Sequence, residues 1–163
     1  MEVYLLRHGI AAERGAGEDA ARELVSDGRR KLRRVLEVAA AAKVAPGLIL
    51  SSPYRRAMQT AEMSAKALHY RKRILQTDAL LPEAAPDAFW ELLRSHRHEP
   101  AILAAGHEPM LSAAAAWLLG APTAQIDMKK GSQLRVDLDQ FGPHPRGVLR
   151  WLLTPRLAAV SKG

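Results

Sequence analysis

Short apolar runs alternate along this chain with longer segments whose apolar residues recur at helical spacing. This alternation constrains the fold more than any other feature. Buried strands are predicted at residues 3–6, 48–51 and 101–105, with a further strand between residues 71 and 76. Helices are predicted after caps at Ser26, Ser52 and Asp87, and from Pro109. Strands that alternate with helices indicate an α/β fold of three layers, α/β/α, around a mainly parallel central sheet.

The last third of the chain has a different pattern. Two strand-like runs, at residues 132–138 and 147–153, lie on either side of Gly142 and Pro143. We expect them to pair as antiparallel edge strands near the C-terminus. The whole length of 163 residues suits one folding unit, so residues 1–163 are expected to form a single domain.

The composition excludes several classes of protein. The chain has no cysteine, which excludes disulfides, thiol catalysis and cysteine-bound metal. No apolar run approaches the ~18 residues that a membrane helix needs, and the residues after Met1 lack the basic region of a signal peptide. The expectation is a soluble, cytoplasmic protein that makes no membrane contact.

The net charge of +7 favours an anionic partner. Much of the positive charge lies in the basic stretch at residues 29–34, which is either a patch for nucleic acid or the solvated face of a helix with Glu37 one turn on. Because only 5% of the residues are aromatic and no base-stacking motif is visible, a nucleic-acid partner is not expected.

Polar residues follow each of the three main predicted strands. Arg7, His8 and Gly9 follow the first strand, Arg56 comes shortly after the second, and His107 follows the fourth. Ligands of open α/β sheets bind at the carboxyl ends of the strands, so these residues can converge there. Arginine suits phosphate oxygens, and a neutral imidazole is available as a nucleophile near pH 7. The pattern predicts a pocket for a phosphoryl group.

The same strand ends carry the blocks LRHG at residues 6–9, SSPYRRAMQTA at 51–61 and GHE at 106–108. In this order they resemble the signature of the histidine phosphatase superfamily, also called phosphoglycerate-mutase-like. The short chain is similar to its SixA-like phosphohistidine phosphatase branch, and so are the segments 22–28, 130–132 and 151–155. The resemblance implies no large cap domain, because residues 61–100 are too few for the helical insertion of larger members.

The resemblance also implies a mechanism of two-step phosphoryl transfer with no metal and no cofactor. His8 would attack phosphorus, while Arg7, Arg56 and His107 would hold the oxygens and stabilise the transition state. The backbone of Gly9 would belong to the substrate-binding loop. The Nδ1–H group of His8 would need an acceptor, for which a backbone carbonyl is expected.

The proton donor and the rim of the site are less defined by the sequence. Glu83 is a candidate proton donor in the loop where larger relatives carry one, and Asp87 lies nearby. Both residues also fit plainer roles, as a solvated loop residue and a helix cap. Arg22 would either reach the substrate from its loop or be an exposed arginine without a role in the site.

Three functions are consistent with these residues. The first is removal of phosphate from phosphohistidine in a signalling or phosphocarrier protein, with inorganic phosphate as product, because an imidazole leaves without a strong acid. The second is hydrolysis of small phosphate esters by the same residues. The third is a non-enzymatic module that binds nucleic acid or an acidic partner through the basic stretch.

Overall fold

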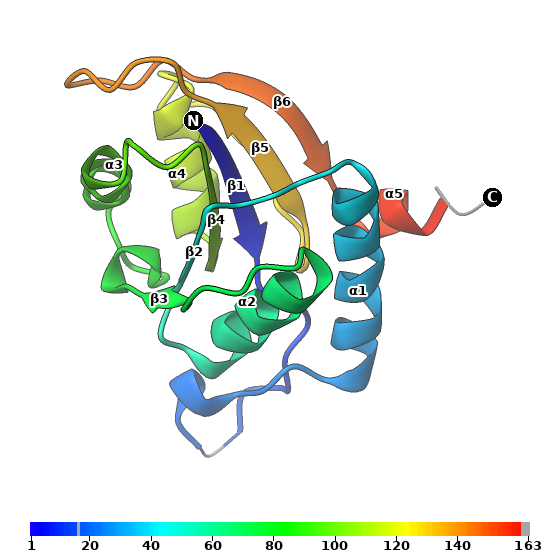
Figure 1. Cartoon of the computed structure of the whole chain (residues 1–163). Coiled ribbons are helices and arrows are strands. Elements are labelled where there is room, and N and C mark those ends of the chain that lie inside the picture. Colours follow the sequence, from blue (N-terminus) through cyan, green and yellow to red (C-terminus); the bar gives the residue numbers. More distant parts are fainter. Residues whose placement is uncertain (16, 161–163) are drawn as a thin grey trace.

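The computed structural model describes residues 1–15 and 17–160. They form one six-stranded sheet flanked by helices (Figure 1). The strands are β1 (Glu2–Arg7), β2 (Leu48–Ser51), β3 (Leu75–Gln76), β4 (Ala101–Gly106), β5 (Gln133–Asp137) and β6 (Val148–Leu153). The helices are α1 (Ser26–Ala41), α2 (Arg55–Ala67), α3 (Pro86–Ser95), α4 (Met110–Leu118) and α5 (Pro155–Val160), with 3₁₀ turns η1 (Asp19–Ala21) and η2 (Asp78–Leu80).

The strand order is β3-β2-β4-β1-β5-β6. The first four strands of this order run parallel, whereas β5 is antiparallel to β1 and β6 is antiparallel to β5. The registers pair Arg7 with Gly106 and Ser51 with Ala105, so β1, β4 and β2 end at the same edge of the sheet. The predicted α/β class, the mainly parallel sheet and the antiparallel strands near the C-terminus are confirmed.

Alternation along β1 explains the three layers. Val3 and Leu5 point into a core shared with α3 and α4, while Tyr4 and Leu6 point into a second core shared with α1 and α2. Successive side chains of a strand face opposite sides of its sheet, so a strand that is apolar at every position must be covered on both sides. Helices α3 and α4 cover one face and α1 and α2 cover the other (Figure 1).

The start of α2 differs from the prediction. The helix begins at Arg55 with Tyr54 as its extended cap residue, not directly after Ser52. The Ser52 hydroxyl accepts a hydrogen bond from the Tyr54 backbone N–H at 3.3 Å, which closes a turn before the helix starts. Ser52 therefore sits at the carboxyl edge of the sheet, where it is fully buried.

The boundaries of three other elements also differ from the predictions. Helix α1 starts at Ser26 itself, and α3 starts at Pro86, so neither Ser26 nor Asp87 is the cap residue. The strand expected at residues 71–76 is only Leu75–Gln76, which lies at the edge of the sheet and pairs with β2 alone. The sequence analysis did not predict α5, which packs against α1.

The connection between β2 and β4 contains α2, β3, η2 and α3, and it adds no large cap domain over the sheet. In the described part of the chain, no helix is long and apolar enough to cross a membrane.

Candidate active site

Backbone hydrogen bonds join the ends of the three central strands. The N–H of His8 donates to the carbonyl of Gly106 at 3.0 Å, and the N–H of Ser52 donates to the carbonyl of Ala105 at 2.9 Å. His107 directly follows Gly106, so its ring lies beside that of His8 with 5.0 Å between the ring centroids. Residues 99 positions apart in the sequence thus share one edge of the sheet.

The ring of His8 is fixed in one tautomer. Its Nδ1–H donates to the carbonyl of Gly9 at 2.7 Å, and its Nε2 accepts a hydrogen bond from Nε–H of Arg56 at 3.3 Å. Burial is the largest cause that lowers the pKa of His8 to about 4. The hydrogen bond to Gly9 opposes this shift, and the charges of Arg56, Arg7 and Lys130 support it. At neutral pH the ring is therefore uncharged, with the Nε2 lone pair facing the guanidinium of Arg56.

The Arg56 guanidinium is held from its other side by the η1 turn. It is 3% exposed, and it donates from Nη1 to the carbonyl of Asp19 at 2.7 Å and from Nη2 to the carboxylate of Asp19 at 3.0 Å. Burial by itself would raise the pKa of Asp19, but the hydrogen bonds and charges of Arg56 and Arg22 outweigh it and hold the pKa below its ordinary value. Asp19 is thus a carboxylate at neutral pH.

Among the described residues, Asp19 is what joins Arg22 to this cluster. Its Nε–H donates to the Asp19 carboxylate at 2.8 Å, and its Nη1 donates to the carbonyl of Ala12 at 2.9 Å. The sequence analysis missed Asp19, which follows the glycines at positions 15 and 17. No local pattern sets Asp19 apart from the other acidic residues of that loop.

His107 is held by Ser52 and Tyr54. Its Nε2 shares a hydrogen bond of 2.8 Å with the Ser52 hydroxyl, and its ring packs edge-on against the Tyr54 ring at 5.0 Å. Burial is the largest cause that lowers the pKa of His107 to about 3. Electrostatic repulsion from protonated His8, Arg56 and Arg7 acts in the same direction, against the charge of Asp19. Both imidazoles of the site are therefore neutral at pH 7. The sequence analysis assigned Ser52 to a helix cap and gave Tyr54 no role.

Arg7 completes the cluster from the end of β1. Its Nη1 donates to the carbonyl of Met128 at 2.6 Å, and burial lowers the pKa of its guanidinium without removing its charge at neutral pH. Among the described residues, neither Nε of Arg7 nor Nδ1 of His107 has a hydrogen-bond partner, although both atoms are buried. Two buried polar atoms of this cluster thus have bonding capacity for an anion.

Three other residues named in the sequence analysis, Gly9, Glu83 and Asp87, add no free hydrogen-bonding group to this cluster. The N–H of Gly9 donates to the hydroxyl of Thr60 at 3.2 Å, so this N–H is already used inside the protein. Glu83 is exposed in the loop after η2, and within the described residues no hydrogen bond or ion pair joins it to the two histidines. Asp87 is exposed in the first turn of α3. The structure does not bring these two carboxylates into the cluster.

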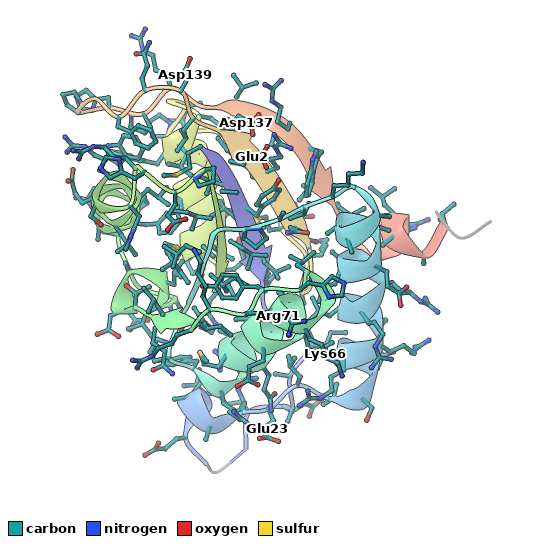
Figure 2. All side chains as sticks on the ribbon, in the orientation of Figure 1. Glu2, Glu23, Lys66, Arg71, Asp137 and Asp139 are labelled. Atoms are coloured by element: carbon teal, nitrogen blue, oxygen red, sulfur yellow. The ribbon has the colours of Figure 1, made fainter. Side chains whose placement is uncertain are left out.

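The acidic side chains Glu2, Asp137 and Asp139 gather at the opposite end of the sheet from Glu23 (Figure 2). Glu2 and Asp137 are both ion-paired with Arg135. The site at the carboxyl ends of β1, β2 and β4 is therefore separated from the acidic end, and Arg7 and Arg56 give it a positive field. Such an arrangement suits a tetrahedral oxyanion next to one unprotonated imidazole.

Comparison with known proteins gives a family for this arrangement. The model of the histidine phosphatase superfamily (branch 1) matches residues 3–85, which include β1, β2 and Arg56. An uncharacterised protein of Picosynechococcus sp. is 31% identical over 163 residues, covering 96% of this chain and 98% of that protein.

Solved structures share the fold over nearly the full length. The protein histidine phosphatase SixA complexed with tungstate is 25% identical with a TM-score of 0.86, covering 96% of this chain and 98% of that one. A SixA protein of Agrobacterium tumefaciens is 25% identical with a TM-score of 0.80, covering 94% and 97%. An α-ribazole-5'-P phosphatase of Escherichia coli, 19% identical over 95% and 98% with a TM-score of 0.71, is similar in fold alone. The chain is thus a SixA-like member of the histidine phosphatase superfamily, branch 1.

Proposed function

We propose that this phosphatase removes the phosphoryl group from phosphohistidine in a protein, with His8 as the nucleophile. One observation carries the proposal. The Nδ1–H of His8 is bound to the carbonyl of Gly9, which leaves the lone pair of Nε2 directed at the guanidinium of Arg56. A nucleophile thus lies beside a cation that would hold the phosphoryl oxygens.

In the first step, the bond from Nε2 of His8 to phosphorus forms while the bond from phosphorus to the substrate nitrogen breaks. A substrate ring that already carries a proton on its other nitrogen leaves as neutral imidazole. Arg7 and Arg56 would offset the negative charge on the three phosphoryl oxygens. A phosphoryl dianion would also raise the pKa of His107 by opposing the effects that lower it. His107 could then take up a proton and donate a hydrogen bond to an oxygen.

In the second step, water attacks phosphorus and the bond to His8 breaks, which releases inorganic phosphate. The hydrogen bond from Nδ1 of His8 to Gly9 supports both steps, because it keeps the same nitrogen directed at phosphorus throughout. Its acceptor is the backbone carbonyl, so it does not depend on a second titrating group.

The acids around the site favour phosphohistidine over an alkyl phosphate. Asp19 is ionised at neutral pH and therefore cannot protonate a leaving group. Glu83 is exposed and stays a candidate donor that would have to approach with the substrate. Imidazole leaves more readily than an alkoxide, so it needs less help from an acid. The likeness to SixA and the lack of a large cap domain support a protein substrate.

The test compares phosphate release from three substrates: a phosphohistidine protein, a phosphoserine peptide and a sugar phosphate. We expect fast release from the first, and a phosphoenzyme trapped by acid-free gel analysis in the wild type but not in His8→Asn. Arg56→Gln should lose about a thousandfold in kcat/KM. Arg55→Gln, which removes the same charge from the exposed neighbour, should lose little.

Preference for the sugar phosphate would replace the proposal with the second function, hydrolysis of small esters. Lack of turnover in all three assays, with salt-dependent DNA binding, would support a non-enzymatic basic module instead. Full activity of His8→Asn would refute the assigned nucleophile. The single sheet built from strands between Glu2 and Leu153 supports the proposal that one domain carries the whole activity.

A further inference from the structure

A cavity of about 760 Å³ opens beside the candidate active site. It lies between α1, α5 and the loop that precedes β5, and we call it the docking groove. Six cationic side chains line it, namely Arg7, Lys31, Arg34, Lys129, Lys130 and Arg156. None of the described residues that line it is acidic.

The docking groove is continuous with the site through Arg7, which belongs to both. The loop that carries Lys130 is tied to the end of β1, because the N–H of Gly131 donates to the carbonyl of His8 at 3.0 Å. The charge of Lys130 also acts on the ring of His8. A chain segment that placed its phosphoryl group at His8 could therefore extend directly into the groove.

The groove keeps a net positive charge although some of its cations are paired. Asp27 forms an ion pair with Lys31 at 2.6 Å, and Asp127 forms one with Lys129 at 2.7 Å. These two carboxylates offset two of the six cations, so the balance of charge at the groove stays positive. Charge complementarity thus favours an anionic occupant close to the reacting phosphorus.

The lining also indicates which kind of anion fits. Ile10, Pro155 and Ala159 add apolar surface between the cations, which suits a peptide with both acidic and apolar side chains. No described lining residue is aromatic, so the groove offers no ring on which a base could stack. We propose that the docking groove binds an acidic segment of the phosphoprotein substrate, next to its phosphohistidine. This inference rests on the proposed phosphohistidine activity.

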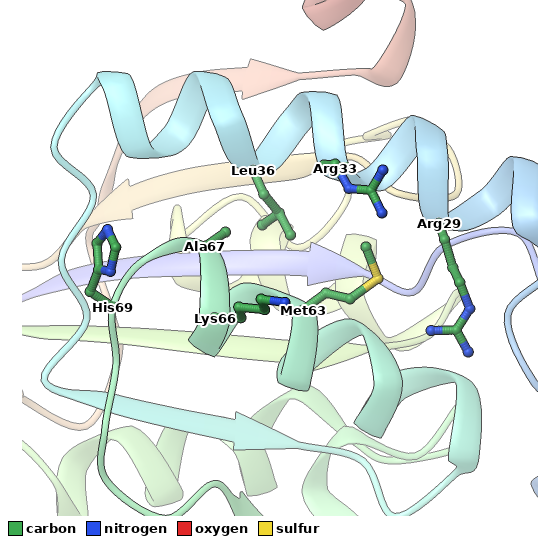
Figure 3. Close-up of a pocket in the computed structure, with 7 residues that line it drawn as sticks. All are labelled: Arg29, Arg33, Leu36, Met63, Lys66, Ala67 and His69. Carbon is green, nitrogen blue, oxygen red and sulfur yellow. The ribbon is translucent and has the colours of Figure 1, made fainter.

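A second cationic groove on the same helix provides a matched control. It lies between α1 and α2 and has a volume of about 440 Å³, with Arg29, Arg33 and Lys66 among its lining residues (Figure 3). Arg29 and Arg33 do not line the docking groove, although they belong to the same helix as Lys31 and Arg34. Removing two positive charges from either groove changes the total charge of the protein equally.

The experiment uses two phosphohistidine peptides that differ only in flanking residues, which are glutamate in one and glutamine in the other. The readout is the ratio of their kcat/KM values, since a ratio cancels any change in the chemical step. At low salt we expect the wild type to prefer the glutamate peptide about tenfold. Lys31→Gln/Arg34→Gln should reduce this preference to about twofold, and Arg29→Gln/Arg33→Gln should keep it.

Three results would overturn the inference. Equal kcat/KM values for the two peptides in the wild type would show that the groove does not select acidic residues. An equal loss of preference in both double variants would show a general charge effect. Competition by DNA or by anionic phospholipid vesicles, without any preference between the peptides, would assign the groove to another class of partner. Free phosphohistidine serves as the reference substrate. If neither the peptides nor free phosphohistidine are hydrolysed, the proposed function fails, and the proposed role of the docking groove fails with it.

Discussion

Lowering the pH from about 7.5 to about 5 should destabilise the folded protein by about 4 kcal/mol through two side chains alone. These are His8 and His107, which are 6% and 1% exposed. Their pKa values of about 4 and about 3 keep both rings mostly neutral in the folded protein at pH 5. In the unfolded chain, a histidine has a pKa of about 6.5 and is protonated at that pH.

The sign and size of this pH effect follow from the number of protons that the folded and unfolded states bind. Below about pH 6.5, the unfolded chain binds more protons than the folded protein at these two rings, so stability falls as the pH falls. The slope is about 1.4 kcal/mol per pH unit for each histidine. Between about pH 6.5 and about pH 5, the free energy of unfolding falls by about 2 kcal/mol for each ring. This stability is fully present above about pH 6.5.

Urea unfolding at both pH values would measure the effect, with His8→Asn/His107→Gln as the reference. The asparagine keeps a donor for the carbonyl of Gly9, and the glutamine keeps a polar group for Ser52. The free energy of unfolding of the wild type should fall by about 4 kcal/mol more than that of the double variant. Carboxylates with lowered pKa values, such as Asp19, change the free energy of unfolding mainly below about pH 5.

A pH dependence that is equal in the wild type and the double variant would refute the reasoning. It would mean that both rings take up protons in the folded protein, so they could not be the neutral pair described above. Nuclear magnetic resonance titration of the two rings would give the same answer independently, with no protonation of either ring above about pH 5.

Three further perturbations test other contacts. Asp19→Asn should tighten phosphate or tungstate binding about tenfold in calorimetry, because the carboxylate competes with the anion for Arg56; weaker binding would contradict this. Gly28→Ala should lower the free energy of unfolding by about 3 kcal/mol, because a Cβ there lies 2.2 Å from a backbone oxygen. Gly17→Ala, with open space around it, should change stability little in the same assay. Ser52→Ala should lower kcat/KM about tenfold by freeing the second histidine ring; unchanged kinetics would remove Ser52 from its positioning role.

Local patterns in the sequence determined the elements of the fold. The apolar runs that became β1, β2 and β4 are short and continuous, which is typical of strands covered on both faces. Helical spacing and turn residues located α1 to α4 within a few residues. The strand predicted at residues 71–76 is only the two-residue β3, and the six-residue α5 was not predicted; both elements are too short to produce a periodic signal.

The sequence by itself also determined that Arg7, His8, Arg56 and His107 lie at or just after the ends of strands, because blocks of neighbouring residues carry that information. Only the tertiary structure decided that Asp19 closes on Arg56, 37 residues away, and that Ser52 holds His107, 55 residues away. It also decided that α1 and α5 form one cationic groove with the loop before β5. Such contacts depend on how strands and helices pack, and residues that meet only through packing leave no periodicity or spacing along the chain.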